Sequence, residues 1–435
     1  MKPSRPVRLK MDKPVYGGEC LARAAGSEGK PGKAIFVPLT LPSETVTAQI
    51  VEEKRSFAKA ELDQVIAASP HRVAPACPHF GVCGGCHYQH ADYTTQLALK
   101  EQILRETLTR AGVLFPAEIG VLAKDPWSYR NRIRLALTSD GELGYRSRRS
   151  HAIVPIRECP IAAPGLLLTA RQVAAFIAEY PAPIGITELE VFTDAEESQL
   201  LVTLFCEKNP TTSAQPWLNA LHATLPPQVT GIRLQLADGS LNPPILAAVG
   251  QSSILYSAGG FDYRVNHGAF FQVNRWLADD FVALVTGNHS GHLAWDLYAG
   301  VGLFARQLTR SYAQVIAVES APASFDALQQ NLENTSARAF RSTTLDYLRR
   351  NRQEREGRPD RIVLDPPRAG LGEETTSLLN AIGAPVMVYV SCDPATLARD
   401  LHALTQERYK IDSITLVDMF PQTFHLETVV SLSRS

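Results

Sequence analysis

The sequence predicts a three-part protein: an N-terminal OB-like β-barrel, a central β-rich region and a C-terminal, Rossmann-like α/β domain with a doubly wound parallel sheet. Three observations support this. A chain of 435 residues is too long for one ordinary domain. Strand-like alternation runs through most of the first 260 residues, and apolar strands alternate with helical segments in the last third. A hydrophobic content of 45% with 20% charged residues is typical of a globular protein with real cores.

Residues 1–70 predict the barrel. Val, Ile, Thr and Phe alternate there with polar residues, and Gly and Pro separate the segments VRLKMDKPVYGGECLAR, GKAIFVPLT and ETVTAQIVEEKRSFAKAEL. Residues 92–112 predict an amphipathic helix with Asp92 as its N-cap and Gly112 at its end.

The central region is expected to consist of strands. Its segments are RNRIRLALTS, HAIVPIREC, ITELEVFTD, QLLVTLFCE and GIRLQLADG. We assign residues 71–91 and 125–262 to this domain, and residues 92–124 and 263–435 to the α/β domain.

Charge and targeting signals narrow the classes of function. A net charge of −1 argues against a wholly basic nucleic-acid coat. Residues 127–150 nevertheless carry six Arg against two acids, and Arg338–Arg361 carries eight Arg against four. Such clusters fit either phosphate contacts or solvated, ion-paired faces. Neither a secretory signal nor a membrane-length apolar run is present, so we expect a cytoplasmic protein with reduced thiols and no membrane partner.

Three cysteines crowd into one Gly-rich loop, ACPHFGVCGGCHYQH, at residues 76–90. Cys77, Cys83 and Cys86 in a reducing compartment indicate metal ligation more than disulfides. By chemistry alone the metal could be zinc, with histidines close by, or the iron of a cluster.

Acidic residues end three strands of the α/β domain. Asp296 ends the strand in HLAWDLYAGVGLFARQL, where Gly300 and Gly302 let a ligand approach the backbone. Glu319 ends the next strand and could bind ribose hydroxyls, and Asp365 ends the strand in RIVLDPPRAG. Because an acid disfavours a pyrophosphate and tolerates a sulfonium cation, we favour S-adenosylmethionine over a dinucleotide. Simple helix-capping acids are the alternative.

Two residues near the C-terminus are candidates for catalysis. In PVMVYVSCDPATLARD, Cys392 lies between a strand end and a helix that starts at Pro394; it is either a nucleophile or an inert buried thiol. The charge of Asp393 is expected to favour its protonated form. Glu427, in FPQTFHLETVVSLSRS, is either a base with a raised pKa or part of a surface turn.

Several motifs together resemble the RNA uracil-5-methyltransferase family. They are FFQVN at 270–274, DLYAGVGLF, LDPPRAG, SCDPATLARD, HLETVVSL, the loop CPHFGVCGGC, and RECP around Cys159. The resemblance covers nearly the whole chain. Within the family, the chain is most similar to 23S rRNA enzymes that carry an N-terminal TRAM barrel and an iron–sulfur cluster.

The resemblance implies a ligand set and a cofactor site. A [4Fe-4S] cluster would be held by Cys77, Cys83, Cys86 and Cys159. The site for S-adenosylmethionine would comprise Gln272, Tyr298, Glu319, Asp346, Asp365, Asp296, Gly300 and Gly302. Leu303 and Asp393 depart from the family pattern, in which Asn is usual at both places.

The implied reaction forms 5-methyluridine. Cys392 would attack C6 of the target uracil, and Glu427 would remove the C5 proton. The expected substrate is 23S rRNA, at a uridine of the 1939 type, acted on by a monomer. The rival interpretations are a transfer-RNA enzyme, the same chemistry at another 23S uridine, a non-catalytic RNA-binding protein, and an iron–sulfur redox protein.

Overall fold

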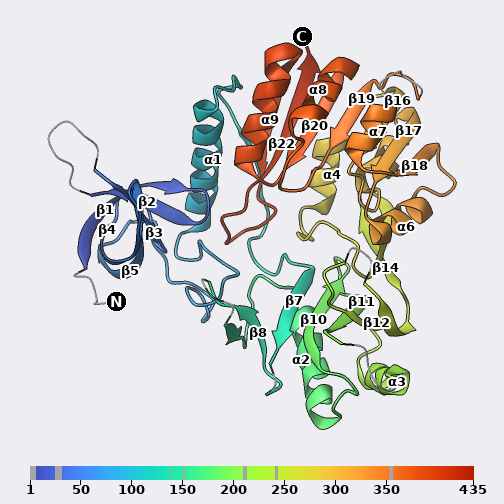
Figure 1. The fold of residues 1–435 in the computed structure, drawn as a ribbon, viewed down its shortest axis with the longest axis horizontal. Helices are drawn as coiled ribbons and strands as arrows, with labels where there is room; N and C mark the ends of the chain where they lie inside the picture. Colours follow the sequence, from blue (N-terminus) through green and yellow to red (C-terminus); the bar gives the residue numbers. More distant parts are fainter. Residues whose placement is uncertain are drawn as a thin grey trace. The chain divides into compact units, whose positions relative to one another are not determined.

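The computed structural model describes residues 6–24, 32–138, 140–148, 150, 152–208, 213–240, 243–351 and 356–435 (Figure 1). Its contacts divide the chain into two compact units. The first, which we call the barrel unit, comprises Met1–Thr107, Arg146–Ala152 and Phe420–His425. The second, the sheet unit, comprises Leu108–Tyr145, Ile153–Met419 and Leu426–Ser435.

The barrel unit begins with a closed five-stranded barrel, which confirms the expected architecture of the N-terminal segment. The strand order around the barrel is β1-β2-β3-β5-β4. Alternate residues point inward and form an apolar core, as period-two alternation requires. The strands are β1 (Val7–Val15), β2 (Glu19–Arg23), β3 (Ala34–Pro38), β4 (Thr45–Glu53) and β5 (Phe57–Ala67).

Helix α1 (Tyr93–Arg110) forms where the sequence predicts it. The carboxylate of Asp92 accepts a hydrogen bond from the Thr95 N–H at 2.7 Å, which satisfies one of the free donors of the first turn. Gly112 follows the helix with a φ of 72°, a conformation that favours glycine.

The sheet unit contains a seven-stranded sheet with the order β13-β12-β11-β10-β7-β8-β9. Its strands are β7 (Arg132–Leu137), β8 (Leu143–Arg146), β9 (Ile153–Pro155), β10 (Ile186–Thr193), β11 (Leu200–Cys206), β12 (Val229–Leu236) and β13 (Ile245–Gly250). Two helices, α2 (Pro164–Glu179) and α3 (Gln215–Thr224), were not expected in this strand-rich region. Because α3 connects β11 to β12, these two strands run parallel. A hairpin of β14 (Ser253–Ala258) and β15 (Phe261–Asn266) follows.

The second sheet of this unit has eight strands in the order β18-β17-β16-β19-β20-β22-β21-β6. The strands are β6 (Gly120–Leu122), β16 (Gly291–Leu297), β17 (Tyr312–Glu319), β18 (Ala337–Arg341), β19 (Arg361–Leu364), β20 (Val386–Ser391), β21 (Tyr409–Val417) and β22 (Glu427–Arg434). The helices are α4 (Ala278–Thr286), α5 (Leu303–Leu308), α6 (Pro322–Asn331), α7 (Thr344–Asn351), α8 (Glu373–Ile382) and α9 (Pro394–Glu407).

The order of these strands confirms a doubly wound sheet. Strands β16 to β20 are all parallel, whereas β22 runs antiparallel to both of its neighbours, so the sheet is mixed rather than wholly parallel. The chain moves outward from β16 through β17 to β18 and then returns to β19 on the other side of β16. Open α/β sheets bind ligands at such a switch point, beyond the carboxyl ends of the strands.

The arginines of residues 127–150 are largely paired where the structure describes them. Arg134 contacts Glu188 and lies over Phe205, and Arg132 lies over Phe192. For Arg132 and Arg134, these contacts favour ion-paired faces over phosphate contacts. No helix among the described residues is long and apolar enough to cross a membrane.

Candidate active site

Three predicted site residues lie beyond the carboxyl ends of adjacent strands. Asp296 lies near the end of β16, Asp365 directly follows β19, and Cys392 directly follows β20. Strand β19 pairs in parallel with β16 on one side and β20 on the other. The three side chains therefore originate at one edge of the sheet, at its switch point.

Glu427 comes to the same edge through an antiparallel pairing. Ser391 of β20 pairs with Thr428 of β22, so the next residues beyond this pair are Cys392 and Glu427. The side chain of Glu427 begins β22 and is 5% exposed, which rules out the surface turn considered for it. Register thus sets the candidate nucleophile beside the candidate base.

Buried acids and one arginine set the protonation of this pair. Burial raises the pKa of the Cys392 thiol to about 11, and the charges of Glu427 and Asp365 contribute to the rise. Burial also raises the pKa of Glu427 well above its usual value, with Asp365 contributing. Arg368 opposes both shifts. The Cys392 thiol is therefore protonated near neutral pH.

Asp393 has a different role from the one expected. It is the N-cap of α9, and one carboxylate oxygen accepts hydrogen bonds from the N–H groups of Ala395 and Thr396, both at 3.0 Å. The acids that raise the pKa of Cys392 are instead Glu427 and Asp365. Adjacency in the sequence was a poor guide to which acid raises the pKa of Cys392, because the side chain of Asp393 is directed to the N-terminus of α9.

Arg368 is the site residue that the sequence reasoning missed. The loop that carries it is held by α9: Thr396 Oγ1 donates to the Arg368 carbonyl at 3.1 Å, and Asp400 accepts from the Leu371 N–H at 2.7 Å. Asp400 also accepts from the Tyr389 hydroxyl at 2.8 Å. The signal was available, since Arg368 lies in LDPPRAG, three residues after Asp365.

The buried carboxyl group of Asp296 favours the binding of a cation where β16 leads into α5. Its side chain is fully buried; Oδ2 accepts from the Ala305 N–H at 2.7 Å, whereas Oδ1 is buried without a hydrogen-bond partner. Burial raises its pKa to about 8, and the nearby charges of Asp365 and Glu319 add to the rise. A positive charge bound here would offset the repulsion among these carboxylates.

Glu319 has a fixed carboxylate at the end of β17. One oxygen accepts from the Gly300 N–H at 2.8 Å, and the other accepts from the Ser320 and Ala321 N–H groups at 2.7 and 2.6 Å. A methyl group added at Gly300 would meet no atom within 4 Å, so open space adjoins the backbone there. A fixed acid beside open space suits a ribose.

The remaining predicted contacts are placed differently. Gln272 is buried, and its side-chain amide donates to Asp365 at 3.4 Å, which joins the two residues. Tyr298 follows β16 with a φ of 68° and is half-buried. Asp346 is exposed in the first turn of α7, where its carboxylate accepts from the Thr343 hydroxyl at 2.7 Å.

The cysteine loop belongs to the barrel unit, and Cys159 belongs to the sheet unit. The loop thiols and Cys159 are half-buried, whereas Cys20 and Cys206 are packed in cores. Within the described parts of the chain, no three His, Cys, Asp or Glu side chains converge as ligands of one metal ion. By its chemistry, a set of four thiols suits either zinc or an iron–sulfur cluster.

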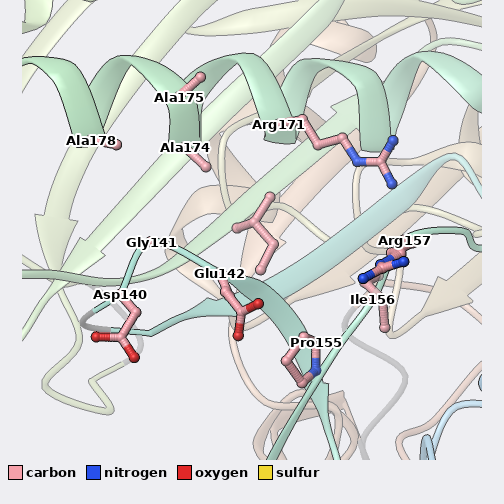
Figure 2. Close-up of a pocket in the computed structure, with 11 residues that line it drawn as sticks. Asp140, Gly141, Glu142, Pro155, Ile156, Arg157, Arg171, Ala174, Ala175 and Ala178 are labelled. Carbon is pink, nitrogen blue, oxygen red and sulfur yellow. The ribbon is translucent and has the colours of Figure 1, made fainter.

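A further pocket of about 590 Å³ lies in the sheet unit, away from these residues. Figure 2 shows four charged residues that line this pocket: Arg171 on α2, Arg157, Asp140 and Glu142. Because both signs of charge line this pocket, it favours no single class of charged ligand.

Comparison with known proteins places these residues in a family. Residues 351–435, which include Asp365, Arg368, Cys392 and Glu427, match the family model described as tRNA (uracil-5-)-methyltransferase. The chain is 33% identical to a 23S rRNA (uracil(1939)-C(5))-methyltransferase from Shewanella frigidimarina, over 93% of this chain and 92% of that one. It is 31% identical to an uncharacterized RNA methyltransferase from Streptomyces avermitilis, over 96% of both chains.

A solved structure agrees with these relatives. The Pyrococcus abyssi tRNA (uracil-54, C5)-methyltransferase, in complex with S-adenosyl-L-homocysteine, is 25% identical and superposes with a TM-score of 0.76. The match covers 98% of this chain and 100% of that one. The chain therefore belongs to the RNA uracil-5-methyltransferase family and is an RNA methyltransferase.

Proposed function

We propose that the chain transfers a methyl group from S-adenosylmethionine to C5 of a uridine in 23S rRNA. The observation that carries this proposal is the grouping of Cys392, Glu427 and Asp365 beside a buried acidic edge that suits a sulfonium. Relatives named for uracil 1939 of 23S rRNA support that uridine as the target.

The chemistry we propose is covalent. The Cys392 thiolate adds to C6 of the uracil, which places negative charge on C5 and O4. C5 then takes the methyl group, the carbon–sulfur bond of the sulfonium breaks, and S-adenosylhomocysteine leaves. Glu427 as carboxylate accepts the C5 proton, the C6–sulfur bond breaks, and Cys392 departs as thiolate. The target base must leave its stack to reach these residues.

The charges around Cys392 support a thiol that is activated only in the loaded site. Burial, together with the charges of Glu427 and Asp365, raises the pKa of the thiol, so the free enzyme keeps it protonated. A sulfonium cation would favour the thiolate, as Arg368 already does. Asp365, held by Gln272, is placed to accept a hydrogen bond from the flipped uracil or the cofactor.

Cofactor contacts are proposed for the remaining predicted residues. Asp296 and Glu319 would face the sulfonium end and the ribose, with Gly300 and Gly302 allowing close approach. Gln272, Tyr298 and Asp346 complete the proposed set, with Asp346 nearest the adenine.

We also propose that a [4Fe-4S] cluster is bound by Cys77, Cys83, Cys86 and Cys159. A set of four half-buried thiols, which is the number of thiolates that such a cluster takes, supports this assignment. The methyl transfer needs no redox step, so the cluster would be structural or would position RNA. The three-domain division, with a TRAM-type barrel, and the cytoplasmic, monomeric state stay predictions.

Transfer RNA is the second candidate substrate, because the family model and the Pyrococcus abyssi structure are both named for tRNA. The decisive test offers unmodified 23S rRNA and unmodified tRNA together with S-adenosylmethionine, followed by mass spectrometry of both RNAs. Methylation of one 23S uridine is the expected result. Methylation of tRNA alone would overturn the substrate and leave the chemistry intact.

A further inference from the structure

A pocket in the barrel unit lies outside the site described above. It has a volume of about 240 Å³. It is lined by the β1–β2 turn at Gly17 and Gly18, by Glu19 at the start of β2, and by Pro38, Leu39, His87, Arg148 and Phe424. Every lining residue belongs to the barrel unit. The volume is below the roughly 300 Å³ at which pockets for drug-sized ligands begin, so the pocket suits a single base or nucleotide.

Aromatic rings form one side of this pocket. The rings of His87 and Phe424 meet at 4.6 Å with an interplanar angle of 75°, and Tyr16 meets Phe424 edge-on at 5.3 Å. Phe424 is half-buried, so part of its ring remains accessible. Accessible aromatic rings are the usual platforms on which proteins stack unpaired bases.

The segment that presents Phe424 is held rigidly. Gln422 is 2% exposed and has a φ of 67°, a left-handed conformation that costs free energy. Its carbonyl accepts from the N–H groups of His87 and Tyr88 at 2.8 and 3.0 Å. Its side-chain oxygen also accepts from the Gln96 side chain at 2.9 Å. A platform held in this way loses little freedom when a ligand binds.

Another part of the pocket lining, the β1–β2 turn, requires glycine at position 18. Gly18 has a φ of 85°, and a methyl group added there would lie 2.9 Å from Cβ of His87. A methyl group on Gly17 would instead meet nothing within 4 Å, so the backbone of the turn borders open space. A ligand can thus approach this backbone directly.

Charged groups complete the pocket. Arg148 bonds Glu61 through one terminal nitrogen at 2.7 Å, and a guanidinium with five N–H donors can also meet a phosphate. The carboxylate of Glu19, at the start of β2, can accept hydrogen bonds from the amino or imino groups of a base.

We propose that this pocket binds one unpaired nucleotide of the substrate RNA, distinct from the target uridine. Its base stacks on the ring of Phe424 and meets the ring of His87 edge-on, and its phosphate meets Arg148. The proposal rests on the proposed function for the identity of the RNA, and it adds a second point of recognition in the barrel unit.

The test compares Phe424→Leu with Phe424→Trp and with Phe57→Leu, which removes a barrel aromatic that does not line the pocket. Affinity for unmodified 23S rRNA is measured by filter binding at fixed salt, and KM and kcat by methyl transfer. Phe424→Leu is expected to weaken binding and raise KM about tenfold, which corresponds to about 1.4 kcal/mol, with kcat unchanged. Phe424→Trp and Phe57→Leu should behave as the parent. Unchanged affinity in Phe424→Leu would overturn the proposal.

A second variant keeps the proposal testable if Phe424→Leu does not fold. Arg148→Gln should reduce the slope of log affinity against log salt by about one, as expected for one lost phosphate contact. Glu61→Gln is the control, because it removes the ion pair and keeps the guanidinium. An unchanged slope, or the same slope change in Glu61→Gln, would count against a phosphate on Arg148.

These outcomes separate the two proposals. If the parent methylates RNA but Phe424→Leu and Arg148→Gln bind as it does, the nucleotide pocket is wrong and the function stands. If the parent methylates no RNA yet both variants lose affinity, the function is wrong and the pocket stands.

Discussion

At the residue scale, the protonation of Cys392 depends on three side chains from two other segments. Glu427 and Asp365 favour the thiol, and Arg368 favours the thiolate. A thiol with a pKa near 11 is protected in the free enzyme and needs additional positive charge before it can act as a nucleophile.

Replacement of the nucleophile should separate chemistry from binding. Cys392→Ala is expected to lower the rate of methyl transfer about a thousandfold or more, because no covalent adduct can form. Affinity for S-adenosylmethionine, measured by calorimetry, should stay unchanged. Cys206→Ala, which alters a core thiol, is the matched control. Substantial methylation by Cys392→Ala would refute the covalent mechanism.

Replacement of the base should trap an intermediate. In Glu427→Gln the thiolate can still add and the methyl group can still transfer, but the amide cannot accept the C5 proton. We expect a protein–RNA adduct that survives denaturing electrophoresis. It should be absent from the double variant Cys392→Ala/Glu427→Gln. If Glu427→Gln forms no adduct and keeps turnover, another group is the base.

Removal of Arg368 should change the pH dependence. Since Arg368 lowers the pKa values of both Cys392 and Glu427, Arg368→Ala raises both. The thiolate fraction rises with pH, so the rising limb of kcat/KM should move to higher pH, with a several-fold loss at pH 8. Arg368→Lys keeps a positive charge and should restore part of the shift. A pH profile identical to that of the parent would show that Arg368 does not act on the thiol.

At the element scale, the turn from β16 into α5 is built for close packing as well as ligand access. Gly302 has a φ of 91°, and a methyl group there would lie 2.7 Å from the Leu328 side chain on α6. Gly300 also has a positive φ, of 55°, but it borders open space. The two glycines, two positions apart, therefore serve different purposes.

This difference is measurable. Gly302→Ala should lower the free energy of unfolding by about 2–4 kcal/mol, because backbone strain and overpacking add. Gly300→Ala should lose only the strain, about 1–2 kcal/mol, while raising KM for S-adenosylmethionine. Urea unfolding and methyl-transfer kinetics provide the two measurements. Equal losses of stability would contradict the packing role of Gly302.

At the scale of the whole molecule, the chain passes repeatedly between the two units. Phe420–His425 belongs to the barrel unit, although β21 and β22, which flank it in sequence, belong to the sheet unit. Arg146–Ala152 likewise belongs to the barrel unit, between segments of the sheet unit. Of the four proposed cluster cysteines, three belong to the barrel unit and Cys159 belongs to the sheet unit. A cluster bound by all four would link segments far apart in the sequence.

Iron content tests this link. Cys83→Ser should lose most of the iron and acid-labile sulfide of the purified protein, and its thermal unfolding should begin at a lower temperature. Cys20→Ser is the control: the Cys20 thiol lies in the barrel core and donates to the Thr40 carbonyl, a hydrogen bond that serine can retain. Iron content unaffected by Cys83→Ser would remove that residue from the ligand set.

Local patterns were sufficient for elements whose periodicity and end signals agree. The barrel was predicted from the alternation of apolar and polar residues. Helix α1 was predicted because Asp92 and Gly112 mark its two ends. Helices α2 and α3 were missed although signals were present: PGLLLTARQVAAFIAE has 16 residues, which is longer than an ordinary strand, and both helices begin with Pro in the first turn.

By itself, the sequence determined which residues could react and which family the motifs indicate, because reactive groups and their spacing are written in the chain. Only the tertiary structure decided the surroundings of those groups. The register of β20 and β22 set Glu427 beside Cys392, α9 held the loop of Arg368, and the helix terminus took the carboxylate of Asp393. Charge effects on a pKa depend on distance and burial, and both arise from pairings between segments remote in sequence.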